Sequence, residues 1–219
     1  MNYYGQDGLD KYIHQNFISK PFIDGTFLEL GAINGITYSN TKFFEDNMGF
    51  NKGILIEPDP ISFQRLVKNR PNCQCFNVAI HSTLKEITLL SCEFNPAVNC
   101  IANIATKQFR NKWHKRKSAE LTLPATTMAS IVEQSNIKYI DFFSLDVEGA
   151  EFECLKSWNW DIPIGLLCIE LNRDFKDIGT ILRKNNFIEI GEHKQEGNVI
   201  NKIFFNKTYF RKEMFTVQF

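Results

Sequence analysis

Apolar residues in this chain fall into short runs, and the segments between several runs have helical spacing. Nearly continuous apolar runs predict buried strands at 26–31, 53–57, 139–145 and 164–171. Further strand patterns lie at 74–80, 86–91, 187–190 and 200–205. Apolar residues at helical spacing predict helices at 41–48, 61–69, 126–134, 150–158 and 174–185.

This alternation of strands and helices predicts an α/β fold. Strands that are apolar on both faces are typical of a parallel sheet covered by helices on both sides. The sequence has no internal repeat, low-complexity tract or flexible linker, so one domain over residues 1–219 is the simplest organisation. Ligands of doubly wound sheets bind at the carboxyl ends of the strands. The residues that follow each strand are therefore the candidate functional residues.

Composition and charge exclude several classes of protein. The chain has 219 residues, 43% of them hydrophobic, and 25 Lys and Arg residues balance 25 Asp and Glu residues. This argues against a disordered chain and against a broadly basic nucleic-acid or membrane-surface protein. The sequence contains no apolar run of about 18 residues, the length that spans a membrane. It also lacks a signal-peptide pattern and a C-x-x-C motif, so we expect reduced thiols and a cytoplasmic location.

Two glycines and two glutamates mark the ends of the first two strands. Glu29 and Gly31 end the first strand, and Gly35 follows in a G-x-x-x-G spacing that differs from the G-x-G-x-x-G of dinucleotide enzymes. Glycine lets the backbone approach a ligand closely, although such a turn is often free of ligand. Glu57 ends the second strand, where a carboxylate either accepts both hydroxyls of a ribose or is solvated in a turn. The glycines and Glu57 together favour ribose recognition.

More carboxylates follow the two apolar strands in the second half of the chain. Asp146 stands directly at the end of the first, and Glu148 and Glu151 lie where acidic residues favour the N-terminus of the next helix. Glu170 and Asn172 stand at the end of the second. Adjacent parallel strands end at one edge of a sheet, so Asp146, Glu170 and Asn172 are a candidate set of oxygen ligands for Mg²⁺ or another divalent cation.

In these segments the sequence resembles the FkbM family of S-adenosylmethionine-dependent methyltransferases. The matching segments are Tyr4-Gly5-Gln6-Asp7, Phe27-Leu28-Glu29-Leu30-Gly31-Ala32 with Asn34-Gly35, Ser39-Asn40-Thr41, Ile56-Glu57-Pro58-Asp59-Pro60, Asn77-Val78-Ala79-Ile80, and the stretch from Ile140 to Glu151. Each piece alone is weakly specific, whereas the ordered set is strongly specific. Ile33 departs from the family, which often has an asparagine beside a small residue in this loop.

The resemblance implies a class I methyltransferase fold, a Rossmann-like three-layer sandwich whose seven-stranded sheet is mostly parallel with an antiparallel last strand. It also implies S-adenosyl-L-methionine as the methyl donor and O-methylation of a hydroxyl, frequently on a sugar, glycan or natural product. The donor-binding residues that it implies are Gln6, Glu29, Gly31, Asn34, Gly35, Ser39, Asn40, Glu57, Asn77, Ala79 and Asp146.

An alcohol acceptor must lose a proton, so the implied reaction needs a general base or a metal ion. Asp146 and Glu170 are the candidate catalytic residues. With Asn172 they also resemble the metal triad of catechol-type methyltransferases, with glutamate in the middle position. His81, just past the third strand, is the alternative base.

Residues 93–120 match no family motif and include a strongly basic stretch at 107–117. We interpret 93–120 as an insertion that caps the strand ends. Its basic residues form either a solvated helical face or a binding surface for an anionic acceptor such as a phosphorylated sugar or RNA. Residues 1–20 are expected to cover the donor.

Three other functions share part of this pattern. A nicotinamide dehydrogenase would have the same sheet and ribose carboxylate, but the glycine spacing argues against it. Cap-type RNA 2′-O-methyltransferases resemble one another in a Lys-Asp-Lys-Glu set, with a lysine soon after the strand that follows the catalytic Asp. Here that strand end has Glu170 and Asn172, and Lys176 is displaced, so RNA is the second choice of acceptor. A protein that binds S-adenosylmethionine without catalysis is the third. A small-molecule or glycan acceptor is therefore favoured over nucleic acid.

Overall fold

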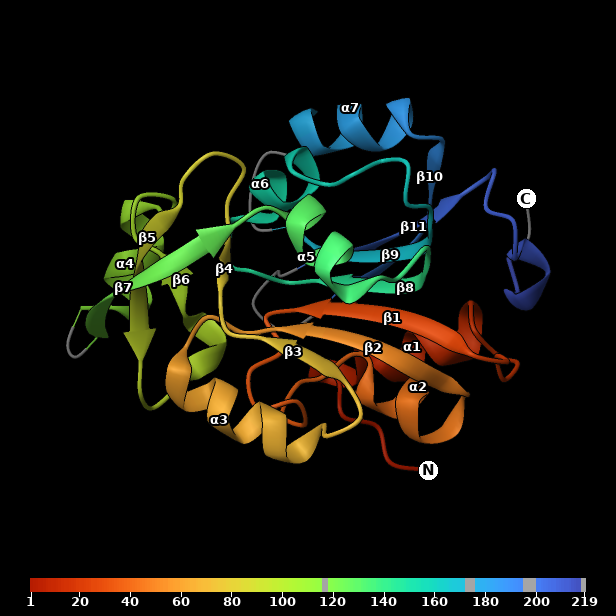
Figure 1. Cartoon of the computed structure of the whole chain (residues 1–219), viewed down its shortest axis with the longest axis horizontal. Coiled ribbons are helices and arrows are strands. Elements are labelled where there is room, and N and C mark those ends of the chain that lie inside the picture. Colours follow the sequence, from red (N-terminus) through yellow and green to blue (C-terminus); the bar gives the residue numbers. More distant parts are fainter. Residues whose placement is uncertain (116–117, 172–175, 195–199, 218–219) are drawn as a thin grey trace.

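The computed structural model covers residues 1–219 and describes all of them except 116–117, 172–175, 195–199 and 218–219. Its described part contains a seven-stranded sheet in the order β10-β11-β9-β8-β1-β2-β3 (Figure 1). The strands are β1 (Gly25–Leu30), β2 (Phe50–Ile56), β3 (Gln74–Phe76), β8 (Ile140–Leu145), β9 (Ile164–Glu170), β10 (Phe187–Lys194) and β11 (Ile200–Asn206).

The sheet has the mixed pairing that the sequence resemblance predicts. Strand β1 pairs in parallel with β2 and β8, and β8 pairs in parallel with β9. The last strand, β11, lies antiparallel between β9 and β10. The carboxyl ends of β1, β2, β8 and β9 therefore meet at one edge of the sheet.

Helices cover both faces of this sheet. Side chains alternate between the two faces along each strand, and those of β1 and β8 are buried on both. Phe27 and Phe142 pack toward α1 (Leu9–Asn16), α2 (Lys42–Asn47) and α3 (Pro60–Asn69). Leu28 and Phe143 pack toward the opposite layer, which is formed by α5 (Met128–Ser135), α6 (Glu151–Lys156) and α7 (Lys176–Lys184). The three-layer α/β architecture predicted from the sequence is thus confirmed.

A second sheet, in the order β4-β7-β5-β6, lies beyond the carboxyl ends of the main strands, at the left of Figure 1. Its strands are β4 (Ala79–Ile80), β5 (Glu86–Cys92), β6 (Cys100–Ile101) and β7 (Ser118–Thr126). The 3-10 turn η2 (Pro96–Val98) and the short helix α4 (Lys107–Trp113) connect these strands. The sequence pattern predicted β5 but not this sheet.

Three of the elements that differ from the sequence prediction do so for a local reason. The strand expected at 74–80 is divided, because the Asn77 amide donates to the carbonyls of Glu57 (2.8 Å) and Pro58 (3.0 Å), and the chain then leaves β3 for the second sheet. Strand β7 escaped prediction because it is partly exposed along most of its length and contains Pro124. Helix α1 escaped because it is preceded by Gly8 without a side-chain cap.

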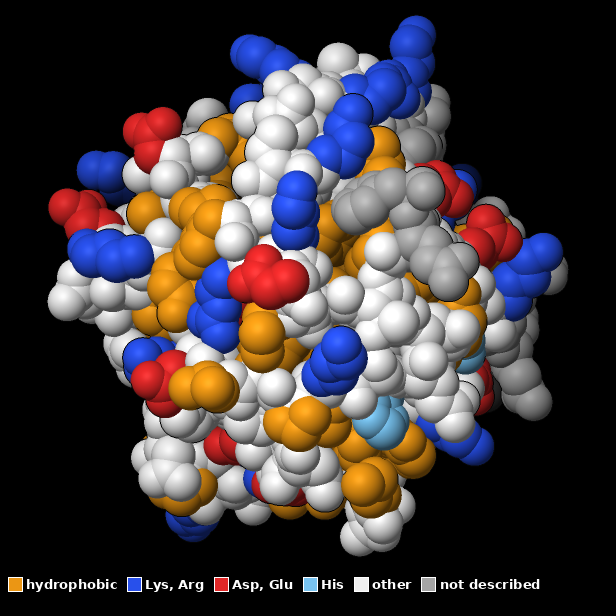
Figure 2. Space-filling view, turned by 90° about the vertical axis from the view of Figure 1, so that its right-hand side faces the viewer, with side chains coloured by type: hydrophobic (Ala, Val, Ile, Leu, Met, Phe, Trp, Pro, Cys, Tyr) orange, Lys and Arg blue, Asp and Glu red, His pale blue; other side chains and the backbone are white. Residues whose placement is uncertain are grey.

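Charged side chains of both signs are mixed with apolar ones on the face at the right of Figure 1, which Figure 2 shows directly. This mixture agrees with the zero formal net charge of the chain. Within the described residues, no helix combines the length and the apolar character needed to cross a membrane.

Candidate active site

A cavity of about 660 Å³ lies at the carboxyl ends of β1, β2, β8 and β9. The second sheet, η2 and α4 supply the opposite wall, including residues 95–101. Its volume is in the usual range for a small-molecule site. The position is the one that the doubly wound sheet predicts for a ligand.

The structure brings most of the sequence-predicted residues to this cavity. Those among its described lining residues are Gln6, Glu29, Gly31, Asn40, Glu57, Ala79, Asp146 and Glu170. Those placed elsewhere are Asn34, Gly35, Ser39, Asn77 and His81. Asn172 lies outside the described residues.

Glu29 ends β1 with a carboxylate that the fold itself surrounds with donors. Its oxygens accept hydrogen bonds from the Ser39 hydroxyl (2.8 Å), the Asn40 backbone N–H (2.7 Å) and the Thr41 hydroxyl (2.7 Å). Burial raises the pKa of Glu29, and the charge of Arg70 and these hydrogen bonds oppose the rise. Glu29 therefore fixes residues 39–41 against the end of β1.

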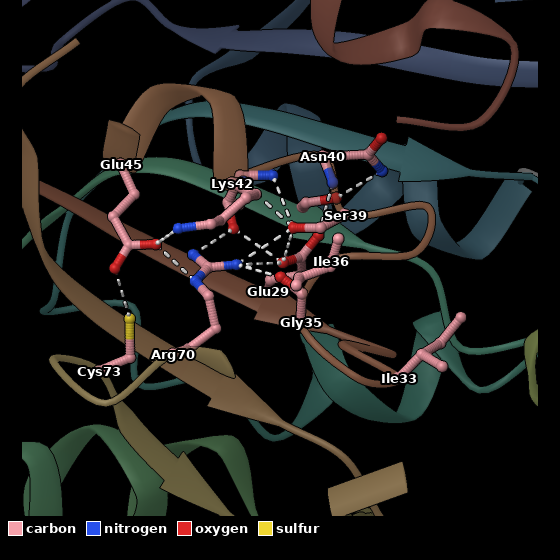
Figure 3. Close-up of polar contacts among 12 residues, drawn as sticks. Glu29, Ile33, Gly35, Ile36, Ser39, Asn40, Lys42, Glu45, Arg70 and Cys73 are labelled. Carbon is pink, nitrogen blue, oxygen red and sulfur yellow. Dashed lines mark hydrogen bonds and ion pairs between the residues drawn. The ribbon is translucent and has the colours of Figure 1, made fainter. Parts of the chain in front are cut away.

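Arg70, directly after α3, is the fully buried cation of this network, and Lys42 also pairs with Glu45 (Figure 3). Its guanidinium lies 3.8 Å from the carboxylate of Glu29 and 2.5 Å from that of Glu45 on α2. The Cys73 thiol contacts the other oxygen of Glu45 at 3.5 Å. No sequence pattern singles out Arg70, because a single arginine at the end of a helix gives no signal of burial.

The two predicted loop glycines are required by the protein's own packing. A Cβ on Gly31, whose φ is +76°, would lie 2.0 Å from the carbonyl oxygen of Asp146. A Cβ on Gly35, whose φ is +77°, would lie 2.6 Å from Cγ of Arg70. Asn34 closes the turn around Gly35, because its side-chain oxygen accepts the backbone N–H groups of Ile36 and Thr37.

Glu57 ends β2 and faces the cavity from a buried position. Its carboxylate accepts the backbone N–H groups of Ile33 and Asp59, each at 2.8 Å. Burial raises the pKa of Glu57 to about 8, although these two hydrogen bonds oppose the rise. A carboxylate has about four acceptor positions, so capacity for two ligand hydroxyls remains.

Asp59 connects this turn to the second sheet. One carboxylate oxygen accepts the backbone N–H of Ser62 and caps α3, and the other accepts the hydroxyl of Ser91 on β5, both at 2.8 Å. All three side chains are buried. The second sheet is therefore hydrogen-bonded to the turn that carries Glu57.

Three carboxyl groups meet at the ends of β8 and β9. Ligand atoms of Asp146, Glu148 and Glu170 lie within 4.8 Å of one another, and all three residues line the cavity. Burial, and then the neighbouring carboxylates, raise the pKa of Asp146 well above its usual range and that of Glu148 to about 8. The charge of Lys112 on α4 opposes the rise at Glu148.

Glu148 and Glu151 have different positions, although the sequence suggested the same role for both. Glu151 accepts the backbone N–H groups of Val147 (3.2 Å) and Gly149 (3.0 Å) at the start of α6, as the sequence interpretation allows. Glu148 has a left-handed backbone, with φ of +52°, and lines the cavity. The sequence placed Glu148 near the strand ends but not among the candidate metal ligands, because side-chain direction in a turn depends on such a backbone angle.

His81 lies outside the cavity lining in the described structure. Its Nδ1 accepts the backbone N–H groups of Thr83 (3.2 Å) and Leu84 (3.1 Å), and it lies 3.6 Å from the carboxylate of Glu153. These contacts close the turn after β4. The structure therefore does not bring His81 together with Asp146 and Glu170.

One face of α4 forms part of the opposite wall. Gln108, Phe109, Lys112 and Trp113 line the cavity and lie at helical spacing of four residues. The Lys112 ammonium lies 4.5 Å from the centroid of the Trp113 ring. His114 anchors the end of the helix, with Nε2 at 2.9 Å from the carbonyl oxygen of Val98.

Solved methyltransferase structures have a similar fold. TrmK of M. capricolum in complex with S-adenosyl-homocysteine has 11% sequence identity and a TM-score of 0.50, over 92% of this chain and 67% of that one. Ribosomal protein L11 methylase from Lactobacillus delbrueckii subsp. bulgaricus has 10% sequence identity and a TM-score of 0.47, over 92% of this chain and 79% of that one. A TehB-like SAM-dependent methyltransferase from Corynebacterium glutamicum has 10% sequence identity and a TM-score of 0.46, over 94% of this chain and 89% of that one. No curated protein matches the sequence.

The likeness to TrmK shows that the fold is that of class I methyltransferases, as the sequence resemblance implies. The profile of the Methyltransferase FkbM domain matches residues 29–189, which is more than half of the chain. That range runs from Glu29 at the end of β1 to Glu189 in β10 and includes the carboxyl cluster. The chain therefore belongs to the FkbM family of methyltransferases and is an S-adenosylmethionine-dependent enzyme.

Proposed function

We propose that this enzyme transfers a methyl group to a hydroxyl of a sugar, glycan or natural product. The observation that supports this most directly is the group of Asp146, Glu148 and Glu170 in the same cavity as Glu57. Glu57 suits the ribose of the donor, and the cluster offers a proton acceptor to an incoming hydroxyl. One cavity thus contains groups for both substrates.

The donor side of the cavity fits S-adenosylmethionine. Glu57 accepts the ribose hydroxyls, Gln6 and Asn40 offer amides toward the methionine portion, and Asp146 offers a carboxylate toward the ammonium group. When bound, S-adenosylmethionine supplies a methyl group that its positively charged sulfur has already activated. The protein's remaining task is to hold the acceptor oxygen in line with that methyl group.

We assign Asp146 as the proton acceptor. With the cationic donor bound nearby, Asp146 would be ionised, and its carboxylate would take the hydroxyl proton as the acceptor oxygen bonds to the methyl carbon and the carbon–sulfur bond breaks, leaving a neutral sulfur on the departing product. Glu170 shares a hydrogen bond with Asp146 and holds its orientation.

We assign residues 93–120 as the cap over the acceptor. Several of them, from η2 to α4, line the cavity wall that faces the strand ends. Phe109 and Trp113 offer ring faces to an acceptor, and Gln108 and Lys112 offer donors to its oxygens. An acceptor with an anionic group would contact Lys112, whereas Lys107, Arg110 and Lys115 are not among the described lining residues.

The thiols support the cytoplasm as the place of action. All six cysteines are free in the structure, and Cys100, Cys154 and Cys168 are buried. Thiols of this kind persist in reducing compartments.

The first test concerns the ribose assignment. At about pH 9, where Glu57 is mostly ionised, replacing it with Gln should weaken the binding of S-adenosylhomocysteine about tenfold, because an amide accepts only through one of its two head atoms. Calorimetry measures the change, and Glu120→Gln on the exposed side of β7 is the control for loss of one negative charge. Equal affinity of E57Q and the wild type would refute the assignment.

The second test uses pH. Because burial raises the pKa of Glu57 to about 8, this group is mostly neutral in the empty enzyme at pH 7 and gains its charge as the pH rises. The ionised form accepts both hydroxyls, so affinity for S-adenosylhomocysteine should increase between about pH 7 and pH 9. The increase should be absent in E57Q. The same increase in both proteins would assign it to another group.

The third test separates catalysis from binding. Asp146→Asn should reduce turnover at saturating donor by about 100-fold or more, while the affinity for S-adenosylhomocysteine changes much less. Transfer of labelled methyl to a panel of glycosides measures turnover, and Asp161→Asn in an exposed loop is the matched control. Undiminished turnover in D146N would exclude Asp146 as the base. A wild type that binds donor but transfers nothing would support the non-catalytic alternative.

The fourth test concerns the divalent cation, which stays a prediction. Asp146 and Glu170 keep the positions that the sequence analysis gave them, and Glu148 offers a third oxygen ligand in addition to the predicted Asn172. If a cation assists deprotonation, a chelator should abolish turnover and added Mg²⁺ should restore it. Unchanged turnover in chelator would leave the carboxylate alone as the base.

A further inference from the structure

Arg70 is fully buried, and its contacts converge on one segment of the chain. Its Nη1 donates to the carbonyl oxygen of Gly35 (3.0 Å) and the hydroxyl of Ser39 (3.2 Å), and its Nη2 donates to the hydroxyl of Thr41 (3.2 Å). Glu45 pairs with Nε at 2.5 Å. A buried guanidinium is tolerated only where several partners surround it, so these contacts hold the side chain in one orientation.

The segment that Arg70 contacts is strained. Between β1 and α2 the backbone takes left-handed angles at two residues other than glycine, Ile33 (φ +48°) and Tyr38 (φ +60°). Both residues line the cavity. Such conformations persist only where surrounding contacts enforce them, and they are common at ligand-binding sites. Arg70 donates hydrogen bonds to Gly35, which lies between the two strained residues, and to Ser39, which directly follows the second.

The same contacts reach the cavity through Glu29 and Asn40 (Figure 3). Ser39 and Thr41, which bond to Arg70, also donate to Glu29, while the Asn40 backbone between them donates to the other oxygen of Glu29. The Asn40 amide then donates to the hydroxyl of Ser144 at 3.1 Å. A movement of Arg70 would therefore displace two cavity-lining residues without exposing Arg70 itself.

We propose that Arg70 is a positioning residue for the methyl donor: it sets the loop after β1, and through Ser39 and Thr41 it places Glu29 and Asn40 in the donor half of the cavity. The inference rests on the donor site described above. It adds a residue that lies outside the cavity lining and acts only through others.

The test is Arg70→Lys, which keeps the charge but removes the planar fork that reaches several partners at once. Calorimetry well below the melting temperature of the variant should show S-adenosylhomocysteine binding weakened about tenfold. In turnover assays the donor KM should rise while kcat at saturating donor stays within about twofold, since the acceptor wall is unchanged.

Arg211→Lys is the matched control. Arg211 is also largely buried and pairs with the buried Asp141 (3.3 Å), but at the opposite ends of the strands, where it also donates to the carbonyl oxygen of Ile23. Loss of this fork should lower the melting temperature and leave donor affinity unchanged. Thr41→Val is a second variant that keeps Arg70 and removes only the hydroxyl joining it to Glu29, and we expect about a threefold loss of donor affinity.

The outcomes separate three cases. A weaker donor complex in R70K and T41V but not in R211K supports the proposal. A lower melting temperature in R70K with unchanged donor affinity would show that Arg70 only stabilises the fold, and if R70K does not fold, unchanged affinity in T41V overturns the proposal. A wild type that does not bind S-adenosylhomocysteine would remove the donor site itself and this proposal with it.

Discussion

The burial of negative charge at the carboxyl ends of the strands is the constraint on which this structure depends. Parallel pairing of β1, β2, β8 and β9 places Glu29, Glu57, Asp146 and Glu170 at one edge, each poorly exposed to water. An unpaired buried carboxylate is strongly unfavourable, so each needs hydrogen-bond donors, a cation or a proton. The surrounding loops differ mainly in which of these they supply.

The loops supply these partners unequally: some carboxylates receive several protein donors, and others lie beside further carboxyl groups. Glu29 receives three protein donors and the charge of Arg70, and Glu57 receives two backbone N–H groups. Asp146 instead lies beside other carboxyl groups, which together with burial raise its pKa. In the proposed mechanism the cationic donor would offset this repulsion and let Asp146 ionise, the state in which it could accept a proton from a hydroxyl.

The sequence predicted the structure well where the pattern within one short segment determines it. Apolar runs located the main strands, and polar residues at their ends located Glu57, Asp146 and Glu170 in the cavity. It was uninformative where the structure depends on contacts between distant segments. The burial of Arg70 needs Glu29 and Glu45, which lie 41 and 25 positions earlier, and the direction of Glu148 needs a left-handed turn. The second sheet forms because β7, which is half exposed, pairs with β5. The segment that connects these two strands lies within residues 93–120, which match no family motif.

The two halves of the cavity are not mechanically independent. Ser91 of the second sheet bonds to Asp59, and the Asp59 backbone N–H bonds to Glu57, so a continuous path of hydrogen bonds joins the second sheet to the carboxylate that we propose for the ribose. On the other side, the carbonyl oxygen of Asp146 leaves room only for glycine at position 31, so the end of β8 packs directly against the loop after β1. Methyl transfer requires the two substrates to be in line to within a fraction of an ångström. These short links let one fold fix that alignment, although the two walls come from different sheets.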